Sequence, residues 1–400
     1  MSTPTLLKSN RIENDAEAIR AAYHVADYAL EQRNLRDQQR LLPHDVIQKL
    51  TQNRLTAIRI PKIYGGAQVS HQTLVKIFRI LAKADANVGQ IPQNSFGVLK
   101  VIELIGSEQQ KQFVFNEILN GKFLANGGPE RHTHDTKTLA TTLTVEHGKY
   151  YVDGEKFYST GSFFADWLAI KAIHPDGYVV LILVDRHADG VEVIDDWNGF
   201  GQRTTSSGTV KLNHVRINPD LIFDERPLAN SVSVRGAYSQ ILQVAIDVGI
   251  AEAAYQDTLS IVQKARPIVD AKVEKARQEA YTIQEVGKLD VLLHAAIELL
   301  EDAALYLDEL DHLEHISEQH AAEASIRVAE AKIYAHHAAL TISEKLFELG
   351  GSRSSLKKFN LDQHWRNARV HTLHDPVRWK YFALGNYYLN GVRPARHAWI

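Results

Sequence analysis

The sequence predicts an α+β protein that is mostly helical, with its strands gathered in the middle of the chain. Residues 14–122 carry apolar side chains at helical spacing. From Phe123 onward short β-rich runs follow one another, separated by turn signals such as Asp153-Gly154. Helical spacing returns after Arg235. We therefore expect three domains, at residues 1–122, 123–232 and 233–400.

Composition excludes several classes of function. The formal net charge of the 400 residues is -3, so we expect no attraction to nucleic acid or to a membrane surface. The chain has no cysteine, which excludes disulfides, thiolate metal sites and cysteine nucleophiles. The first ten residues lack the apolar stretch of a secretory signal, and no apolar run approaches the roughly 18 residues of a membrane helix. We expect a cytoplasmic protein.

Local signals place the helices of the first domain. Ser107 and Gln110 have the spacing of a capping box, so a helix should begin at this point. That helix is expected to bury Phe113, Ile118 and Leu119. Ser70 is expected to cap an earlier helix.

Close-spaced strands in the middle of the chain suggest a small barrel or sandwich. The expected strands are Leu139–Val145, Tyr150–Asp153, Trp167–Ile173, Tyr178–Asp185, Gly190–Ile194 and Thr209–Ile217. In the last domain, the alanine-rich run Ala321–Leu349 predicts a helix buried in a bundle or between subunits. The charged run Arg266–Tyr281 predicts a long loop, and long loops often act as lids.

Four segments resemble signatures of the acyl-CoA dehydrogenase superfamily in their order and spacing. This resemblance implies an N-terminal helical domain, a central β-barrel or sandwich, a C-terminal four-helix bundle and a bound flavin. The segments are Gly106–Lys111, Asp153–Gly161, Gly201–Gly208, and Gly350-Gly351 followed by Trp365–Arg369.

A narrower resemblance points to the sulfur-acquisition oxidoreductases, a group similar to dibenzothiophene monooxygenase. It implies a two-component monooxygenase that receives reduced FMN from a separate NAD(P)H-dependent flavin reductase. Through a C4a-(hydro)peroxyflavin, such an enzyme would oxygenate a small organosulfur compound. We also expect a homotetramer, or else a dimer. The matching segments are Phe164–Trp167, Asp195–Trp197, Gly199–Arg203 and His371–Pro376.

His374 and Asp375 are the expected catalytic pair, together with Thr160. They stand where acyl-CoA dehydrogenases carry a Tyr-Glu-Gly segment whose glutamate removes a proton. Aspartate is one methylene shorter, and Pro376 stiffens the backbone, so both features argue against a general base. The resemblance implies that His374 donates to an oxygen species on the flavin. The residues alone favour a core histidine capped by Asp375 over this role, and it is the resemblance that brings the functional reading level with it.

Five residues are expected to bind the flavin. Ser159 and Thr160 end the hairpin that lies beside the ring in the superfamily, and Asn126 matches a flavin-contacting asparagine. Trp197 could stack on the ring or wall it. Arg353 matches an arginine that can hold the FMN phosphate with its planar fork. The same residues also fit ordinary roles as turn caps, core or surface.

The residues at the expected adenine and phosphate contacts favour FMN over FAD as the cofactor. Phe347 replaces the glutamine that precedes the glycine pair in FAD-binding members, and Glu279–Gly287 lacks their arginine–phenylalanine pattern. No metal is expected, because the nineteen histidines show no recognised ligand spacing.

Two alternatives stay open at this level. One is an FAD-dependent acyl-CoA dehydrogenase that uses Asp375. The other is a catalytically inactive flavin-binding paralogue. The second alternative is supported by Asn94 and Val98, which stand where dibenzothiophene monooxygenase has a histidine and a tyrosine. Because of this difference, the substrate is expected to differ as well.

Overall fold

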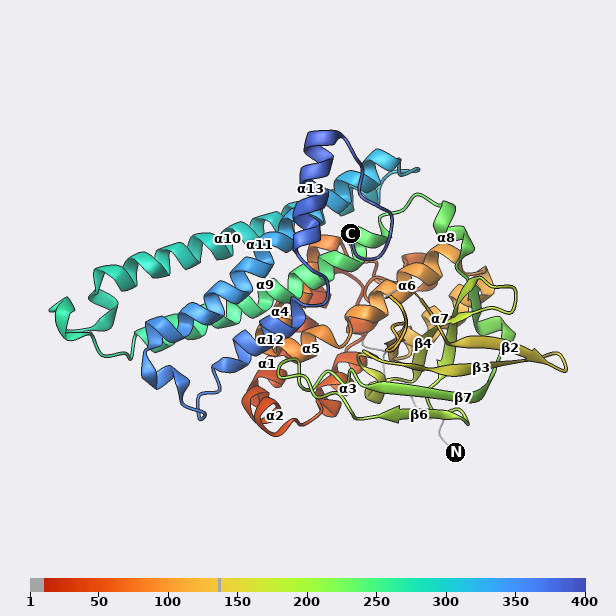
Figure 1. The fold of residues 1–400 in the computed structure, drawn as a ribbon, viewed down its shortest axis with the longest axis horizontal. Helices are drawn as coiled ribbons and strands as arrows, with labels where there is room; N and C mark the ends of the chain where they lie inside the picture. Colours follow the sequence, from red (N-terminus) through yellow and green to blue (C-terminus); the bar gives the residue numbers. More distant parts are fainter. Residues whose placement is uncertain (1–10, 136–137) are drawn as a thin grey trace, which may run out of the picture.

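A computed structural model describes residues 11–135 and 138–400, and it begins with a layer of helices (Figure 1). Seven α-helices precede the first strand within these residues. They are α1 (Asp15–Glu31), α2 (Arg33–Gln39), α3 (His44–Gln52), α4 (His71–Ala84), α5 (Ala86–Gln90), α6 (Gln93–Ile105) and α7 (Glu108–Leu119).

Two predicted caps are present. Ser70 accepts the backbone N–H of Thr73 at the start of α4. Ser107 and Gln110 form the expected capping box at the start of α7, which satisfies two otherwise unpaired N–H groups. Ile118 and Leu119 are buried, but the expected burial of Phe113 is wrong, since this ring is 42% exposed. Phe113 instead lies edge-on against Trp167, with the ring centroids 5.8 Å apart.

The described strands form one eight-stranded sheet. Its order is β6-β7-β3-β2-β4-β5-β8, with β1 paired in parallel to β4. Within the described residues, β2 and β4 are paired in parallel through Thr142 and Ile173. Every predicted run forms a strand, whereas β1 and β8 were not predicted. The strands are β1 (Leu124–Gly127), β2 (Thr142–Glu146), β3 (Lys149–Lys156), β4 (Trp167–Ile173), β5 (Val179–Asp185), β6 (Val191–Ile194), β7 (Thr209–Ile217) and β8 (Ile222–Asp224).

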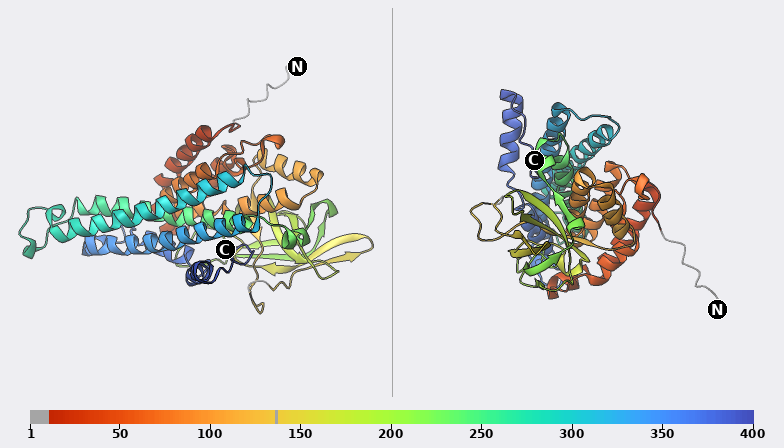
Figure 2. Two further views of the ribbon diagram at one scale, coloured as in Figure 1. Left: turned by 90° about the horizontal axis from the view of Figure 1, so that it is seen from above. Right: turned by 90° about the vertical axis from the view of Figure 1, so that its right-hand side faces the viewer.

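Three long helices dominate the remainder of the chain. Figure 2 shows them running side by side and extending beyond the rest of the molecule. The predicted helix at Ala321–Leu349 is confirmed within α11, and residues 263–279 link α9 to α10 with two short 3-10 turns. The helices are α8 (Arg226–Asn230), α9 (Arg235–Val262), α10 (Ala280–Leu310), α11 (Glu318–Gly350), α12 (Asp362–His371) and α13 (Arg378–Asn390).

α9 is the central element of the packing. Its neighbours include α4 from the first part of the chain and α10, α11 and α12 from the last part. The order of helices and strands matches the three expected domains, whose boundaries stay a prediction. Among the described residues, no helix is long and apolar enough to cross a membrane.

The loop between β6 and β7 meets the C-terminal helices at α12. A Cβ atom on Gly201 would overlap the carbonyl oxygen of Arg366, so glycine permits the close approach. The Asn367 side-chain oxygen accepts the backbone N–H of Gln202 at 2.7 Å. This contact holds α12 against the loop between β6 and β7.

Candidate active site

Asn126 and the hairpin end at Tyr158–Thr160 come together at one edge of the sheet. The Asn126 backbone N–H donates to the Thr160 carbonyl at 3.4 Å. The Asn126 side-chain amide donates to the Tyr158 carbonyl, also at 3.4 Å. These contacts depend on β1, which places Asn126 beside β4.

Trp197 belongs to the same cluster. Its ring lies 6.1 Å from that of Tyr158, and its indole N–H donates to the Gln202 carbonyl at 2.8 Å. Arg40 donates to the Trp197 carbonyl at 2.8 Å. The indole is therefore held in place as a wall next to the predicted flavin residues.

The two predicted hydroxyls of the hairpin differ in their surroundings. The Thr160 hydroxyl lies 2.8 Å from that of Ser207, which lies 2.7 Å from the Thr205 hydroxyl. Thr160 is 7% exposed, so a ligand can reach part of its surface. Ser159 is 0% exposed, and its hydroxyl has no hydrogen-bond partner in the described part of the chain. A flavin contact by Ser159 stays a prediction.

Arg353 lies apart from this cluster. It follows α11 in a short 3-10 turn, is exposed, and has its guanidinium 5.4 Å from the centre of the Phe359 ring. The turn precedes α12, and His374 follows α12. The ten residues of this helix span roughly 15 Å, so Arg353 and His374 sit toward its opposite ends.

His374 and Asp375 line a cavity of about 510 Å³. The His374 side chain is 38% exposed, and its Nδ1 lies 3.4 Å from Oδ1 of the nearly buried Asp375. The other Asp375 oxygen lies 3.0 Å from the ammonium of Lys380. Burial raises the pKa of the Asp375 carboxyl, but Lys332, His374 and Lys380 together lower it far below its ordinary value. Asp375 is therefore a firmly ionised carboxylate.

A fully buried ion pair lies behind this cavity. The Lys332 ammonium on α11 is 2.8 Å from the Asp247 carboxylate on α9, and both side chains are 0% exposed. His371 Nδ1 lies 2.5 Å from the second Asp247 oxygen, and His371 Nε2 lies 3.0 Å from the Gln90 side-chain oxygen. Burial raises the pKa of Asp247, yet Lys332 and His371 lower it to about 2. The network joins α5, α9, α11 and α12.

Sequence reasoning missed Asp247 and Lys332. Asp247 is the single charge in the apolar run Ile241–Ala251, whereas Lys332 stands among several other charged residues in Ala321–Leu349. A charge in such a run must find a buried partner, because an isolated buried charge is costly. This signal could have marked Asp247 as a candidate, but nothing in the sequence singles out Lys332 as its partner.

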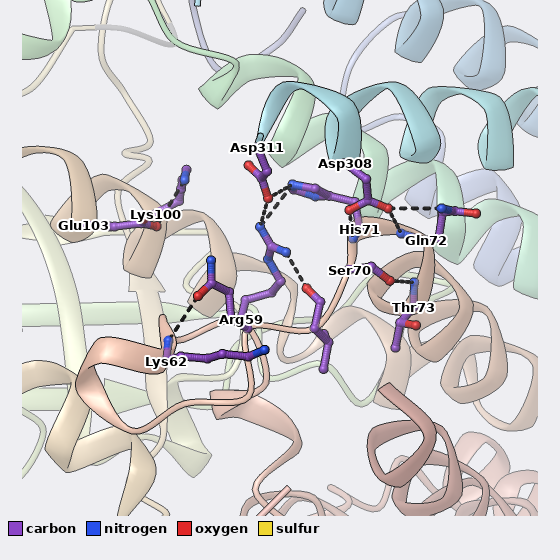
Figure 3. Close-up of polar contacts among 12 residues, drawn as sticks. Arg59, Lys62, Ser70, His71, Gln72, Thr73, Lys100, Glu103, Asp308 and Asp311 are labelled. Carbon is purple, nitrogen blue, oxygen red and sulfur yellow. Dashed lines mark hydrogen bonds and ion pairs between the residues drawn. The ribbon is translucent and has the colours of Figure 1, made fainter. Parts of the chain in front are cut away.

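A third group, on the far end of α10, contains potential metal ligands. His71, Asp308 and Asp311 bring ligand atoms within 4.8 Å of one another. Figure 3 shows, however, that the Arg59 guanidinium already lies among them, 3.1 Å from His71 Nε2 and 2.8 Å from Asp311. Asp308 accepts the backbone N–H groups of His71 and Gln72. The group therefore links Arg59 and the start of α4 to the C-terminal end of α10, and the arginine supplies the positive charge.

Family models match both helical parts of the chain. The acyl-CoA dehydrogenase N-terminal domain matches residues 15–122, and the acyl-CoA dehydrogenase C-terminal domain matches residues 241–379. The chain belongs to the acyl-CoA dehydrogenase family.

Within the acyl-CoA dehydrogenase family, the similar proteins include flavin monooxygenases. Dibenzothiophene monooxygenase from Mycolicibacterium goodii is 30% identical over 85% of this chain and 86% of the relative. A probable FMNH2-dependent monooxygenase, SfnC from Pseudomonas putida, is 27% identical over 86% of this chain and 88% of the relative. The crystal structure of FMN-bound TdsC from Paenibacillus sp. A11-2 has a TM-score of 0.91 and 27% identity, covering 96% of this chain and 100% of that chain.

Asn94 and Val98 are one turn apart on α6, and both are half-buried. Val98 packs against the core cluster that contains Leu99 and Ile102. These side chains cannot supply the imidazole or phenol expected from the resemblance to dibenzothiophene monooxygenase. The difference in substrate stays a prediction.

Proposed function

We propose that this protein is a monooxygenase that uses reduced FMN and oxygen to oxygenate a small organosulfur compound. The observation that carries the proposal is the His374–Asp375 pair at the wall of a cavity of about 510 Å³. The pair stands where a dehydrogenase would need its catalytic base. The relatives named for dibenzothiophene and for FMNH2 support the oxygenase chemistry and the choice of FMN.

The residues of the sheet edge fit a flavin ring. Asn126 and Thr160 offer polar groups on one side, and Trp197 offers an aromatic wall. Reduced FMN, when bound, supplies the electrons that activate oxygen. Arg353 would hold the phosphate, since its exposed guanidinium can form two parallel bonds to phosphate oxygens.

His374 would act on the oxygen species next to the flavin. Its Nδ1–H faces the ionised Asp375, so Nε2 on the opposite side of the ring can donate an N–H to a developing oxyanion when the ring carries its second proton. Trp379, Phe382 and Trp399 line the cavity with aromatic surface. Exclusion of water would limit loss of the activated oxygen as hydrogen peroxide, although Trp379 and Phe382 are each 58% exposed in the single chain.

The structure argues against the dehydrogenase alternative. A general base that removes a weakly acidic carbon-bound proton needs a pKa not far below the working pH. Asp375 is paired with Lys380 at 3.0 Å, and its pKa is well below the ordinary range. This carboxylate is therefore suited to orienting His374 rather than to abstracting a proton.

The proposal also includes the partners. A separate NAD(P)H-dependent reductase would supply FMNH2, and the cytoplasm, where NAD(P)H is available, would be the site of action. Exposed apolar side chains on α13, including Trp379, Phe382 and Leu389, suit a homotetramer or a dimer. Light scattering that shows a monodisperse monomer would contradict the assembly.

The test is the variant His374→Ala, with His24→Ala as the control. His24 is exposed on α1, in the first helical layer, and does not line the cavity. We expect His374→Ala to bind FMNH2 but to lose roughly 10²–10³-fold in oxygenation rate, with hydrogen peroxide formed instead. His24→Ala should match the wild type. A His374→Ala protein that is less stable yet fully coupled would reduce His374 to a structural role.

A further inference from the structure

Lys380 on α13 is a buried cation with contacts to two different parts of the chain. It is 2% exposed, although most of its helix projects away from the molecule (Figure 1). Its ammonium lies 3.0 Å from Asp375, donates to the Trp399 carbonyl, and lies 3.5 Å from the Gln240 side-chain oxygen. Lys380 therefore bridges the acid beside His374 and the C-terminal segment 391–400.

Residues 391–400 make specific contacts with α9 and α11. A Cβ atom on Gly236 would overlap the Ile400 carbonyl oxygen, so this glycine admits the chain end. The Gln240 side chain donates to the Ala398 carbonyl at 3.0 Å. Arg393 pairs with Glu318 at 2.6 Å in the first turn of α11. These contacts turn the segment back toward α9 after α13.

The same segment closes one side of the cavity that His374 lines. Its contributions to the lining include Val392, Pro394 and Trp399, opposite the His374–Pro376 stretch. Lys380 stands between the two walls, because it touches Asp375 on one side and the Trp399 carbonyl on the other.

Stability alone is a weak reason to bury this lysine. Removing an ammonium from water costs several kcal/mol, and a buried ion pair often stabilises a fold no better than apolar side chains. Burial indeed lowers the pKa of Lys380, while Asp375 raises it in compensation. What the ammonium provides and an apolar side chain cannot is a positive charge 3.0 Å from one oxygen of the Asp375 carboxylate, whose other oxygen faces His374.

We propose that Lys380 is a positioning residue of the oxygenation reaction. Its ammonium aims Asp375 at His374 Nδ1, and its bond to the Trp399 carbonyl holds the C-terminal segment as a wall of the same cavity. This inference rests on the proposed function, since the aligned group is the histidine that would donate to oxygen.

The charges that face Asp375 come from several elements. Lys332 approaches from α11, Lys380 from α13, and His374 is its neighbour in the chain. His397 of the C-terminal segment also lines the cavity. When Lys380 is replaced by methionine, Asp375 keeps Lys332 but loses its direct cation, so its pKa rises and its protonation begins at a higher pH.

The first experiment needs neither flavin nor activity. Hydrogen exchange of residues 391–400 is compared between the wild type and Lys380→Met. We expect exchange in this segment to accelerate roughly ten- to hundredfold in the variant, as for loss of one charge-assisted hydrogen bond. Unchanged exchange would overturn the link between Lys380 and the C-terminal segment. If the methionine variant does not fold, Lys380→Gln replaces it, with a smaller acceleration expected because the neutral amide can still donate to the Trp399 carbonyl.

The second experiment measures oxygenated product per FMNH2 consumed, as a function of pH. Lys380→Met should be poorly coupled, increasingly so as the pH falls. The double variant with Asp375→Asn should lose less than the sum of the two single losses, because both changes act on one carboxylate while only Lys380→Met also frees the Trp399 carbonyl. Additive losses, or full coupling of Lys380→Met at every pH, would refute the positioning role.

Gly236→Ala is the matched control that disturbs the C-terminal wall of the cavity without changing Lys380 or Asp375. Its Cβ atom displaces the C-terminal segment without touching Asp375, so coupling should fall while its pH dependence stays that of the wild type. A wild-type protein that oxygenates no organosulfur compound would overturn the proposed function and the reaction role of Lys380 with it. Unchanged exchange at 391–400 would count against the Lys380 contact alone.

Discussion

Replacing Lys332 by methionine should expose the cost of an unpaired buried carboxylate. Asp247 and Lys332 are both 0% exposed and 2.8 Å apart. Methionine fills similar space but leaves Asp247 with His371 as its remaining close partner, at 2.5 Å. Breaking a buried pair by removing one partner typically costs about 3–5 kcal/mol. Because His371 still faces the carboxylate, we expect the lower half of this range.

The corresponding change in melting temperature follows from chain length. At about 2 cal/mol/K per residue, 400 residues have an unfolding entropy of roughly 0.8 kcal/mol/K if they unfold as one unit. A loss of about 3–4 kcal/mol then lowers the melting temperature by roughly 4–5 °C. Differential scanning calorimetry or fluorescence melting at pH 7 measures this shift.

A second substitution separates charge from packing. Asp247→Asn added to Lys332→Met removes the unpaired charge while keeping the shape of the side chain. We expect the double variant to regain most of the lost stability. The pH dependence of this stability loss is set by the Asp247 carboxyl. Its pKa is about 2 in the wild type and must rise when Lys332 is absent. The deficit of Lys332→Met should therefore shrink as the pH falls and Asp247 is neutralised. A double variant no more stable than Lys332→Met would refute the electrostatic reasoning.

Three further results are expected. Arg353→Ala should weaken FMNH2 binding roughly ten- to hundredfold in a titration, and unchanged affinity would remove Arg353 from the phosphate site. Gly201→Ala should cost about 1–3 kcal/mol in denaturant unfolding, because its Cβ atom meets the Arg366 carbonyl of α12; wild-type stability would mean that the loop simply moves aside. Burial lowers the pKa of Lys156 to about 8, while Glu130 raises it. The unfolded chain therefore binds more protons between roughly pH 8 and pH 10, and stability should rise with pH across that window in denaturant melts. Lys156→Met should abolish this rise.

Periodicity in the sequence was enough to locate most of the secondary structure. Alternating and helical patterns depend on neighbours a few residues away, so they survive without knowledge of the fold. The capping box at Ser107 was predictable for the same reason. β1 and β8 were missed because four and three residues are too short to show a period, and pairing with β4 and β5 creates them.

For the candidate site, too, the sequence predicted one part and the tertiary structure supplied the other. The motif segments alone point to Asn126, Thr160, Trp197, His374 and Asp375. Their mutual arrangement is not contained in the motifs. Parallel pairing of β1 with β4 places Asn126 at the Tyr158–Thr160 hairpin end. The approach of α12 to Gly201 then brings the C-terminal helices to the same edge.

By itself, the sequence determined the order of helices and strands, the absence of cysteine chemistry and the identity of the polar residues that could serve a flavin. Tertiary structure alone decided that Lys332 meets Asp247 and that Lys380 joins Asp375 to the Trp399 carbonyl. The physical reason is distance along the chain. Asp247 and Lys332 lie 85 positions apart, and only the packing of α9 against α11 gives either charge its partner.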